Sequence, residues 1–169
     1  LSLPDNVSDN AREIGESLAN EMLRSGELDG IDNIHLIAHS AGSWLIDGFA
    51  DQLHRDPDSH YTVHVTFLDA YYHDGQLPQR AGDGSYTAAL GDTANTAEQY
   101  YTDAGDWLTN EVLPDAFNVD VRQLMNPPGE DWEWRELHRF PVDWYFGTVS
   151  GDPLFPLWGF PSSVEAGNA

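Results

Sequence analysis

The chain has 169 residues, enough for one domain of ordinary size and too few for two. It carries 29 acidic and 7 basic residues, so its formal net charge is −22, which excludes nucleic-acid binding and disfavours anionic membrane surfaces. There is no cysteine, so disulfides, thiolate zinc sites and cysteine nucleophiles are excluded. The apolar fraction of 40 % allows a folded core.

The acidity has more than one interpretation. A carboxylate-rich surface without lysine is typical of halophilic adaptation, and ordinary solubility or scattered divalent-ion sites are the alternatives. Asp74, Asp83 and Asp92 lie in glycine-rich stretches, but their spacing does not match an EF-hand loop, which favours a solvated surface. No apolar run is long enough to span a membrane, and Leu1 does not begin a signal peptide. The start at leucine suggests a processed or truncated chain, with an extracellular location slightly favoured.

The first half of the chain alternates between helical and strand patterns. Ala11, Ile14, Leu18, Met22 and Leu23 recur at helical spacing. In chain order, the sequence predicts a helix from Ser8–Asp9 to Gly26, a strand over 34–38 buried on both faces, a helix over 41–53, a strand from Val63 to Leu68-Asp69, and a long loop or lid over 73–95.

The second half continues the alternation with weaker signals. The pair Tyr100-Tyr101 favours a strand over a helix at 98–102. Further along we expect a strand over 118–124, a loop at 126–129, a helix over 142–149 after Pro141, and an irregular tail over 150–169 packed across the surface. This order predicts a single α/β domain over residues 1–169 with a mainly parallel sheet.

The segment Ala38-His39-Ser40-Ala41-Gly42 places a serine where a strand turns into a helix, in the pattern small-x-Ser-x-Gly. Such a nucleophile elbow holds the serine in strained backbone angles, and large side chains two residues before or after it would collide with the neighbouring strand and helix. The helix that follows points its first N–H groups at the serine, where an oxyanion would form. We therefore expect Ser40 to be a nucleophile.

A serine nucleophile needs a base and a carboxylate that orients the base. Asp69 ends the strand after the serine helix, which brings it to the same sheet edge as Ser40, and Asp103 is the alternative acid. His138 follows the last predicted strand, on a loop, and is the expected base; His73 is the alternative.

The remaining histidines have structural explanations. His39 lies inside the elbow and faces away from the oxyanion side, so we expect it to be a packing residue. His35 and His64 lie within strands, and His54 and His60 flank a polar turn, where structural histidines are common.

Together, Ala38–Gly42, Phe67-Leu68-Asp69 and the segment 138–145 resemble an α/β-hydrolase of the lipase-like serine esterase kind, over about residues 5–150. The placement of the acid is similar to that in the pancreatic-lipase group. The resemblance implies Ser40 as nucleophile, His138 as base, Asp69 as acid and the Ala41 N–H as one oxyanion donor. Members of this fold have several strands and a second oxyanion donor before the nucleophile strand, whereas a single helix precedes it here. The expected sheet is therefore truncated on its N-terminal side, and an upstream segment or another chain would complete the site unless the domain is catalytically impaired.

The sequence thus predicts a serine hydrolase that cleaves a small-molecule or lipid carboxylic ester through an acyl-enzyme, without a metal or organic cofactor. An acyltransferase or amidase with the same triad is an alternative, and so is a non-catalytic binding or structural domain derived from hydrolases. Tyr71, Tyr72, Trp144 and Tyr145 are candidates for an acyl pocket, or they pack in the core.

Overall fold

The computed structural model describes residues 7–72, 90–102, 112–125 and 132–149. The expectations for His73, Asp103, most of the 73–95 loop, the 126–129 loop and the 150–169 tail fall outside these ranges. None of the helices in the described ranges is both long and apolar enough to cross a membrane.

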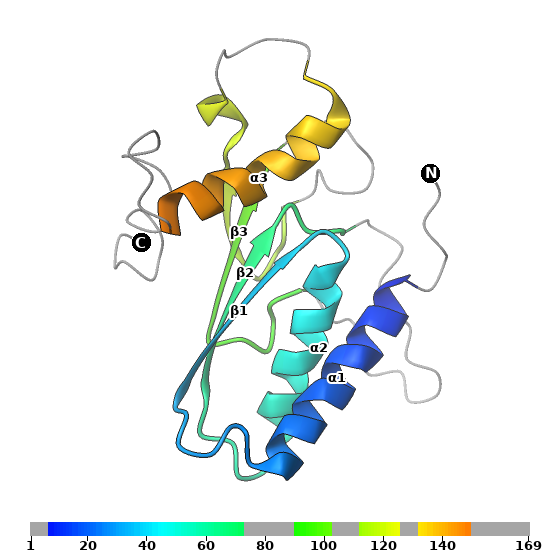
Figure 1. Cartoon of the computed structure of the whole chain (residues 1–169), viewed down its shortest axis with the longest axis vertical. Coiled ribbons are helices and arrows are strands. Elements are labelled where there is room, and N and C mark those ends of the chain that lie inside the picture. Colours follow the sequence, from blue (N-terminus) through cyan, green and yellow to red (C-terminus); the bar gives the residue numbers. More distant parts are fainter. Residues whose placement is uncertain (1–6, 73–89, 103–111, 126–131, 150–169) are drawn as a thin grey trace.

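The described residues form a parallel sheet with helices packed against it (Figure 1). The strands lie side by side in the order β1-β2-β3-β4, and every neighbouring pair is parallel. This arrangement confirms the predicted α/β class. The elements are α1 (Val7–Ser25), β1 (Asn33–His39), α2 (Gly42–Arg55), β2 (Thr62–Leu68), β3 (Thr96–Tyr101), β4 (Phe117–Asp120), a 3-10 turn η1 (Arg122–Leu124) and α3 (Trp134–Val149).

One face of the sheet is covered by α2, and α1 packs on α2. Alternate residues of β1 and β2 point to this helix-packed face, where Val63, Val65 and Phe67 join Trp44 and Phe49 of α2 in the main core. Successive side chains of a strand point to opposite faces, so the intervening residues of β1 and β2 lie on the other face of the sheet.

The buried residues of α1 are small or polar, and of the apolar residues at helical spacing Ala11, Met22 and Leu23 are partly buried against the core. Ser8, Arg12, Gly15 and Ala19 are buried, whereas Ile14 and Leu18 are 57 % and 46 % exposed. Glycines explain this rotation of the helix, because a Cβ at Gly15 would overlap the Leu45 carbonyl and a Cβ at Gly48 would overlap the Arg12 carbonyl. The two backbones therefore approach more closely than larger side chains would allow.

A buried ion-pair network lies in the same contact. Arg12 of α1 pairs with Asp47 and with Asp51 of α2, and Asp51 also pairs with Arg55. Asp47 additionally accepts a hydrogen bond of 2.9 Å from the N–H of Gly91. Burial raises the pKa of Asp47 to about 6, although the charge of Arg12 and this hydrogen bond both act to lower the pKa.

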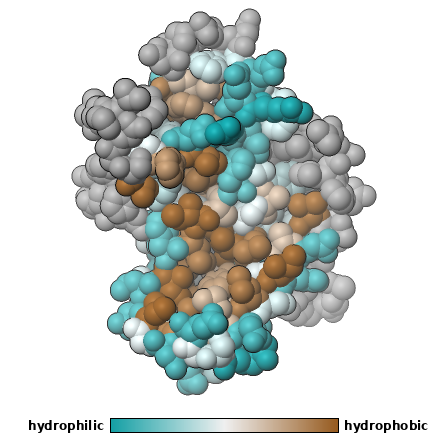
Figure 2. All heavy atoms as spheres, viewed as in Figure 1, coloured by the Kyte–Doolittle hydropathy of each residue, from teal (hydrophilic) through white to brown (hydrophobic). Residues whose placement is uncertain are grey.

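The prediction that the first strand is buried on both faces was wrong. In β1, Ile34, Leu36 and Ala38 are half-buried, while His35 and Ile37 are exposed. β1 lies at an edge of the sheet formed by the described residues, so only one of its faces meets a helix. Figure 2 shows apolar side chains gathered in a band over the region of β1 and α1, and exposed apolar residues here include Ile14, Leu18, Ile31 and Ile37.

Two further expectations for the second half need correction. The strand expected over 118–124 is limited to Phe117–Asp120, because the chain turns into η1 after Val121. The last helix begins at Trp134 instead of after Pro141, so Pro141 lies inside α3. The predicted strand at 98–102 is β3, Thr96–Tyr101.

Candidate active site

Ser40 lies in the turn that joins β1 to α2, with a φ of 55°, in the left-handed region that residues other than glycine rarely adopt. Its N–H donates to the Leu68 carbonyl over 3.1 Å, and its own carbonyl accepts the Tyr71 N–H over 3.1 Å. A Cβ added at Gly42 would lie 3.4 Å from the Ala38 Cβ, at van der Waals contact, so the two positions already lie close together. These features match the expected geometry of a nucleophile elbow.

Asp69 occupies the corresponding position at the end of β2. It too has a positive φ, 48°, and it is fully buried. Its N–H donates to the Tyr100 carbonyl over 2.8 Å, and its Oδ1 accepts the Thr102 N–H over 3.0 Å. These bonds hold the carboxylate at the carboxyl edge of the sheet, one strand from Ser40, with Oδ2 available to a further donor.

His138 of α3 provides that donor. Its Nδ1 lies 2.5 Å from Asp69 Oδ2, and its side chain is half-buried, with 15 % exposed. A carboxylate can only accept a hydrogen bond, so the neutral imidazole carries its proton on Nδ1 in this pair. Nε2 is then left with its lone pair, which is the form of histidine that can take a proton from a hydroxyl.

The prediction that His138 lies on a loop was wrong, because His138 lies in α3. Pro141 in the same helix leaves a backbone carbonyl near His138 without its usual partner. Pro141 has no N–H to donate to the carbonyl of Leu137 four residues earlier, and its ring crowds that carbonyl. The Thr102 hydroxyl donates to the Leu137 carbonyl over 3.0 Å instead. Thr102 therefore contacts both the acid and the helix that carries the base.

His39 makes a second link between the sheet edge and α3. Its Nε2 lies 2.9 Å from the His138 carbonyl oxygen, and the two rings are 4.4 Å apart. Burial lowers the pKa of His39, and the positive charge of a protonated His138 lowers it further; the bond to the carbonyl and the charge of Asp69 oppose this. The packing role predicted for His39 agrees with these contacts, but its support of His138 was not predicted. The order of residues gives no sign of it, because the partner is a backbone atom 99 residues away.

Three of the predicted site residues, Ser40, Asp69 and His138, lie at the carboxyl edge of the sheet, but only two of them are in side-chain contact. His138 and Asp69 are hydrogen-bonded, and the backbone of Ser40 is hydrogen-bonded to Leu68 and Tyr71, one residue before and two residues after Asp69. The Ser40 hydroxyl makes no hydrogen bond to His138 in the part of the chain that the structure describes. In serine hydrolases this hydrogen bond often forms only when substrate is bound. Ala41 lies at the N-terminus of α2, where N–H groups lack intrahelical partners.

The other residues considered lie elsewhere. Asp103 and His73 are outside the described ranges. His54 and His60 are exposed near the far end of α2. All four aromatic candidates for an acyl pocket are buried, so they pack in the core. Tyr71 and Tyr72 belong to the main core, and Trp144 and Tyr145 of α3 belong to a second cluster with Leu68 and Tyr100.

Comparisons of the chain with protein-family models, with curated proteins and with solved structures find no match.

Proposed function

We propose that this chain is a serine hydrolase of the α/β-hydrolase type that cleaves carboxylic esters through an acyl-enzyme. The observation that carries the proposal is the 2.5 Å contact between His138 and the buried Asp69, at the sheet edge where Ser40 has a φ of 55°. Two neighbouring strands end in residues with positive φ, and the histidine comes from a distant helix. Acyl transfer needs an acid, a base and a strained serine at one site, and the hydrogen-bonded acid–base pair lies at the same sheet edge as Ser40.

In the proposed reaction, the Ser40 Oγ attacks the ester carbonyl while His138 Nε2 takes the hydroxyl proton. Asp69 holds the imidazole in the required tautomer and stabilises the imidazolium that forms. The tetrahedral intermediate collapses, His138 returns the proton to the departing alcohol, and an acyl-Ser40 ester remains. Water, deprotonated by the same imidazole, then attacks this ester, and the imidazolium returns the proton to the Ser40 Oγ as the carboxylic acid leaves.

The Ala41 N–H at the start of α2 is the proposed donor to the oxyanion. We assign no second donor among the described residues. In the proposed fold the sheet continues beyond β1, and a segment or chain outside the described residues would supply both the additional strands and the second donor. The place of β1 supports this proposal, because β1 is an edge strand of the sheet formed by the described residues and its outer edge is where further strands would pair. A site that lacks one donor would lose about 3–4 kcal/mol of transition-state stabilisation.

The test is the hydrolysis of p-nitrophenyl esters of increasing acyl length by the full chain, followed in the first seconds and at steady state. We expect a burst of p-nitrophenol of up to one equivalent, because acylation precedes deacylation, and loss of the burst in Ser40→Ala.

Ser43→Ala is the matched control. Ser43 lies three residues further along, in α2, is fully buried, and its hydroxyl has no hydrogen-bond partner among the described residues. This variant should keep the activity. Equal activity in Ser40→Ala and the original chain would overturn the proposal, and so would the absence of turnover and burst in the folded protein, which would favour a non-catalytic domain. Transfer of the acyl group to an added alcohol or amine in preference to water would instead identify an acyltransferase.

A further inference from the structure

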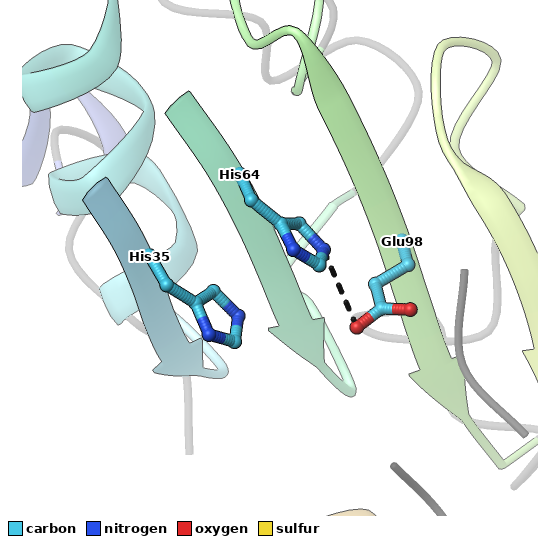
Figure 3. Close-up of side chains that lie close together, drawn as sticks. All are labelled: His35, His64 and Glu98. Carbon is cyan, nitrogen blue, oxygen red and sulfur yellow. Dashed lines mark ion pairs between the residues drawn. The ribbon is translucent and has the colours of Figure 1, made fainter. Parts of the chain in front are cut away.

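Three side chains with metal-binding atoms lie next to one another on the face of the sheet that α2 does not cover. Figure 3 shows His35, His64 and Glu98 on the neighbouring strands β1, β2 and β3, pointing to the same side. His35 and His64 are directly paired in the sheet register, and their rings stack with centroids 4.4 Å apart. One potential ligand atom from each residue lies within 4.8 Å of the others.

The separations within this cluster suit a small cation. His64 Nε2 lies 3.4 Å from Glu98 Oε1. Two ligands bound about 2.1 Å from a tetrahedral zinc ion are separated by about 3.4 Å, so this pair already has the required spacing. The ligand atom of His35 lies within 4.8 Å of those of His64 and Glu98, and its ring is on the exposed side of the cluster.

Glu98 is held in the orientation and charge state of a ligand. Its carboxylate is fully buried and accepts hydrogen bonds of 2.8 Å from the Thr66 hydroxyl on Oε1 and of 2.9 Å from the Tyr100 hydroxyl on Oε2. A buried anion of this kind requires a nearby positive charge. Among the described residues, the ion-pairing partner of Glu98 is His64.

A proton on His64 or a metal ion between the three side chains would each supply that charge. Imidazole nitrogen and carboxylate oxygen together are a frequent ligand set for zinc, and a set of two histidines and one glutamate leaves the fourth tetrahedral position to water. The exposed side of His35 gives this position access from solvent.

We propose that His35, His64 and Glu98 form a zinc-binding site that joins three parallel strands. Thr66 contacts two of the three residues: its hydroxyl lies 2.8 Å from His35 Nε2 and donates to Glu98. The Thr66 hydroxyl therefore accepts from His35 in the metal-free cluster, and this bond is exchanged for a bond to zinc when the ion enters. Because the ion links β1, β2 and β3, binding should stabilise the folded sheet. The site is independent of the proposed hydrolysis at Ser40.

The test uses the full chain, treated with a chelator and titrated with Zn²⁺ by calorimetry and with Co²⁺ by visible absorption. We expect one Zn²⁺ per chain and a higher melting temperature on binding. Co²⁺ should give the intense visible bands of four-coordinate geometry, which cobalt held loosely by surface carboxylates does not give.

His35→Ala and Glu98→Gln should each weaken zinc binding by more than the about 10- to 100-fold that loss of an outer hydrogen-bond partner causes. His35 is exposed, so the His35→Ala variant keeps the proposal testable if Glu98→Gln does not fold. His60→Ala is the matched control, because His60 lies 4.0 Å from Asp32 at an exposed position and should not affect binding.

Unchanged zinc affinity in His35→Ala, or equal competition by Ca²⁺, would show adventitious binding to the acidic surface and overturn the proposal. No binding by the folded chain would overturn it as well.

Discussion

The two faces of the sheet are built on different principles. The helix-packed face joins apolar residues of β1 and β2 to α2, with α1 fixed against α2 by glycines and a buried ion-pair network. The opposite face carries His35, His64 and Glu98 in its middle part. Near its carboxyl end it is covered by α3, whose Trp144 packs on Tyr100 with ring centroids 4.7 Å apart.

This difference separates stability from chemistry within one small sheet. The helix-packed face is filled by side chains and by close backbone contact, so changes there act on folding. The other face and the carboxyl edge hold titratable groups in defined hydrogen bonds, so changes there act on proton transfer and binding. Substitutions at the carboxyl edge should therefore change activity and spare the fold, whereas substitutions on the helix-packed face should change stability, and the following predictions test that separation.

The largest expected effect is on activity, from Asp69→Asn. The substitution keeps the shape of the side chain but favours the wrong imidazole tautomer of His138, so turnover should fall by about 10⁴-fold while the fold is retained. The measurement is the steady-state rate of ester hydrolysis, with circular dichroism as the check on folding. If Asp103→Asn is the damaging change and Asp69→Asn has little effect, the assignment of the acid is wrong.

The next effect is on stability, from Gly48→Ala on the helix-packed face. The new Cβ would overlap the carbonyl of Arg12, so α1 must move away from α2, and unfolding should become easier by about 3 kcal/mol or more. The measurement is urea denaturation. Ser43→Ala, a small change in the same helix, should leave the midpoint nearly unchanged. An equally small effect of Gly48→Ala would contradict the close contact between the helices.

A smaller effect is expected from Asp47 as the pH changes. Its pKa is about 6 in the folded chain and 3.8 as the ordinary value, so the folded state holds the proton more tightly than the unfolded state. Protonated Asp47 therefore contributes to the free energy of unfolding, by roughly 3 kcal/mol at most. This contribution is complete below about pH 4 and is lost as the pH rises through about 6. The measurement is the difference in unfolding free energy between the original chain and Asp47→Asn, from pH 4 to pH 8. We expect that difference to fall as the pH rises. A constant or rising difference would contradict the raised pKa of the buried Asp47 carboxyl.

Much of the site geometry could be predicted because it depends on local pattern and chain order. Small residues on both sides of Ser40 indicate a tight strand-to-helix turn, and Asp69 ends the next parallel strand, so both must reach the same edge. His138 was identified by its position after the last strand, and the structure places it against Asp69.

The parts that could not be predicted depend on contacts between distant segments. The rule that proline ends a helix failed at Pro141, because hydrogen bonds from Thr102 and His39 to the carbonyls of Leu137 and His138 support the helix there. The apolar spacing in α1 identified the helix but not the orientation that exposes Ile14 and Leu18, since Gly15 and Gly48 each lie against the backbone of the opposite helix. His35 and His64 were interpreted as structural because their pairing with Glu98 arises only from the sheet register.

The most direct test of the central claim is reaction of the full chain with a fluorophosphonate, followed by mass spectrometry of the resulting peptides. A serine whose proton is removed by a neighbouring imidazole reacts with this reagent, whereas an ordinary serine does not. The account predicts a single adduct on Ser40, formed in the original chain and in Ser43→Ala, and lost in His138→Ala. A folded chain that gives no adduct on Ser40, or one that is labelled equally with and without His138, would contradict it.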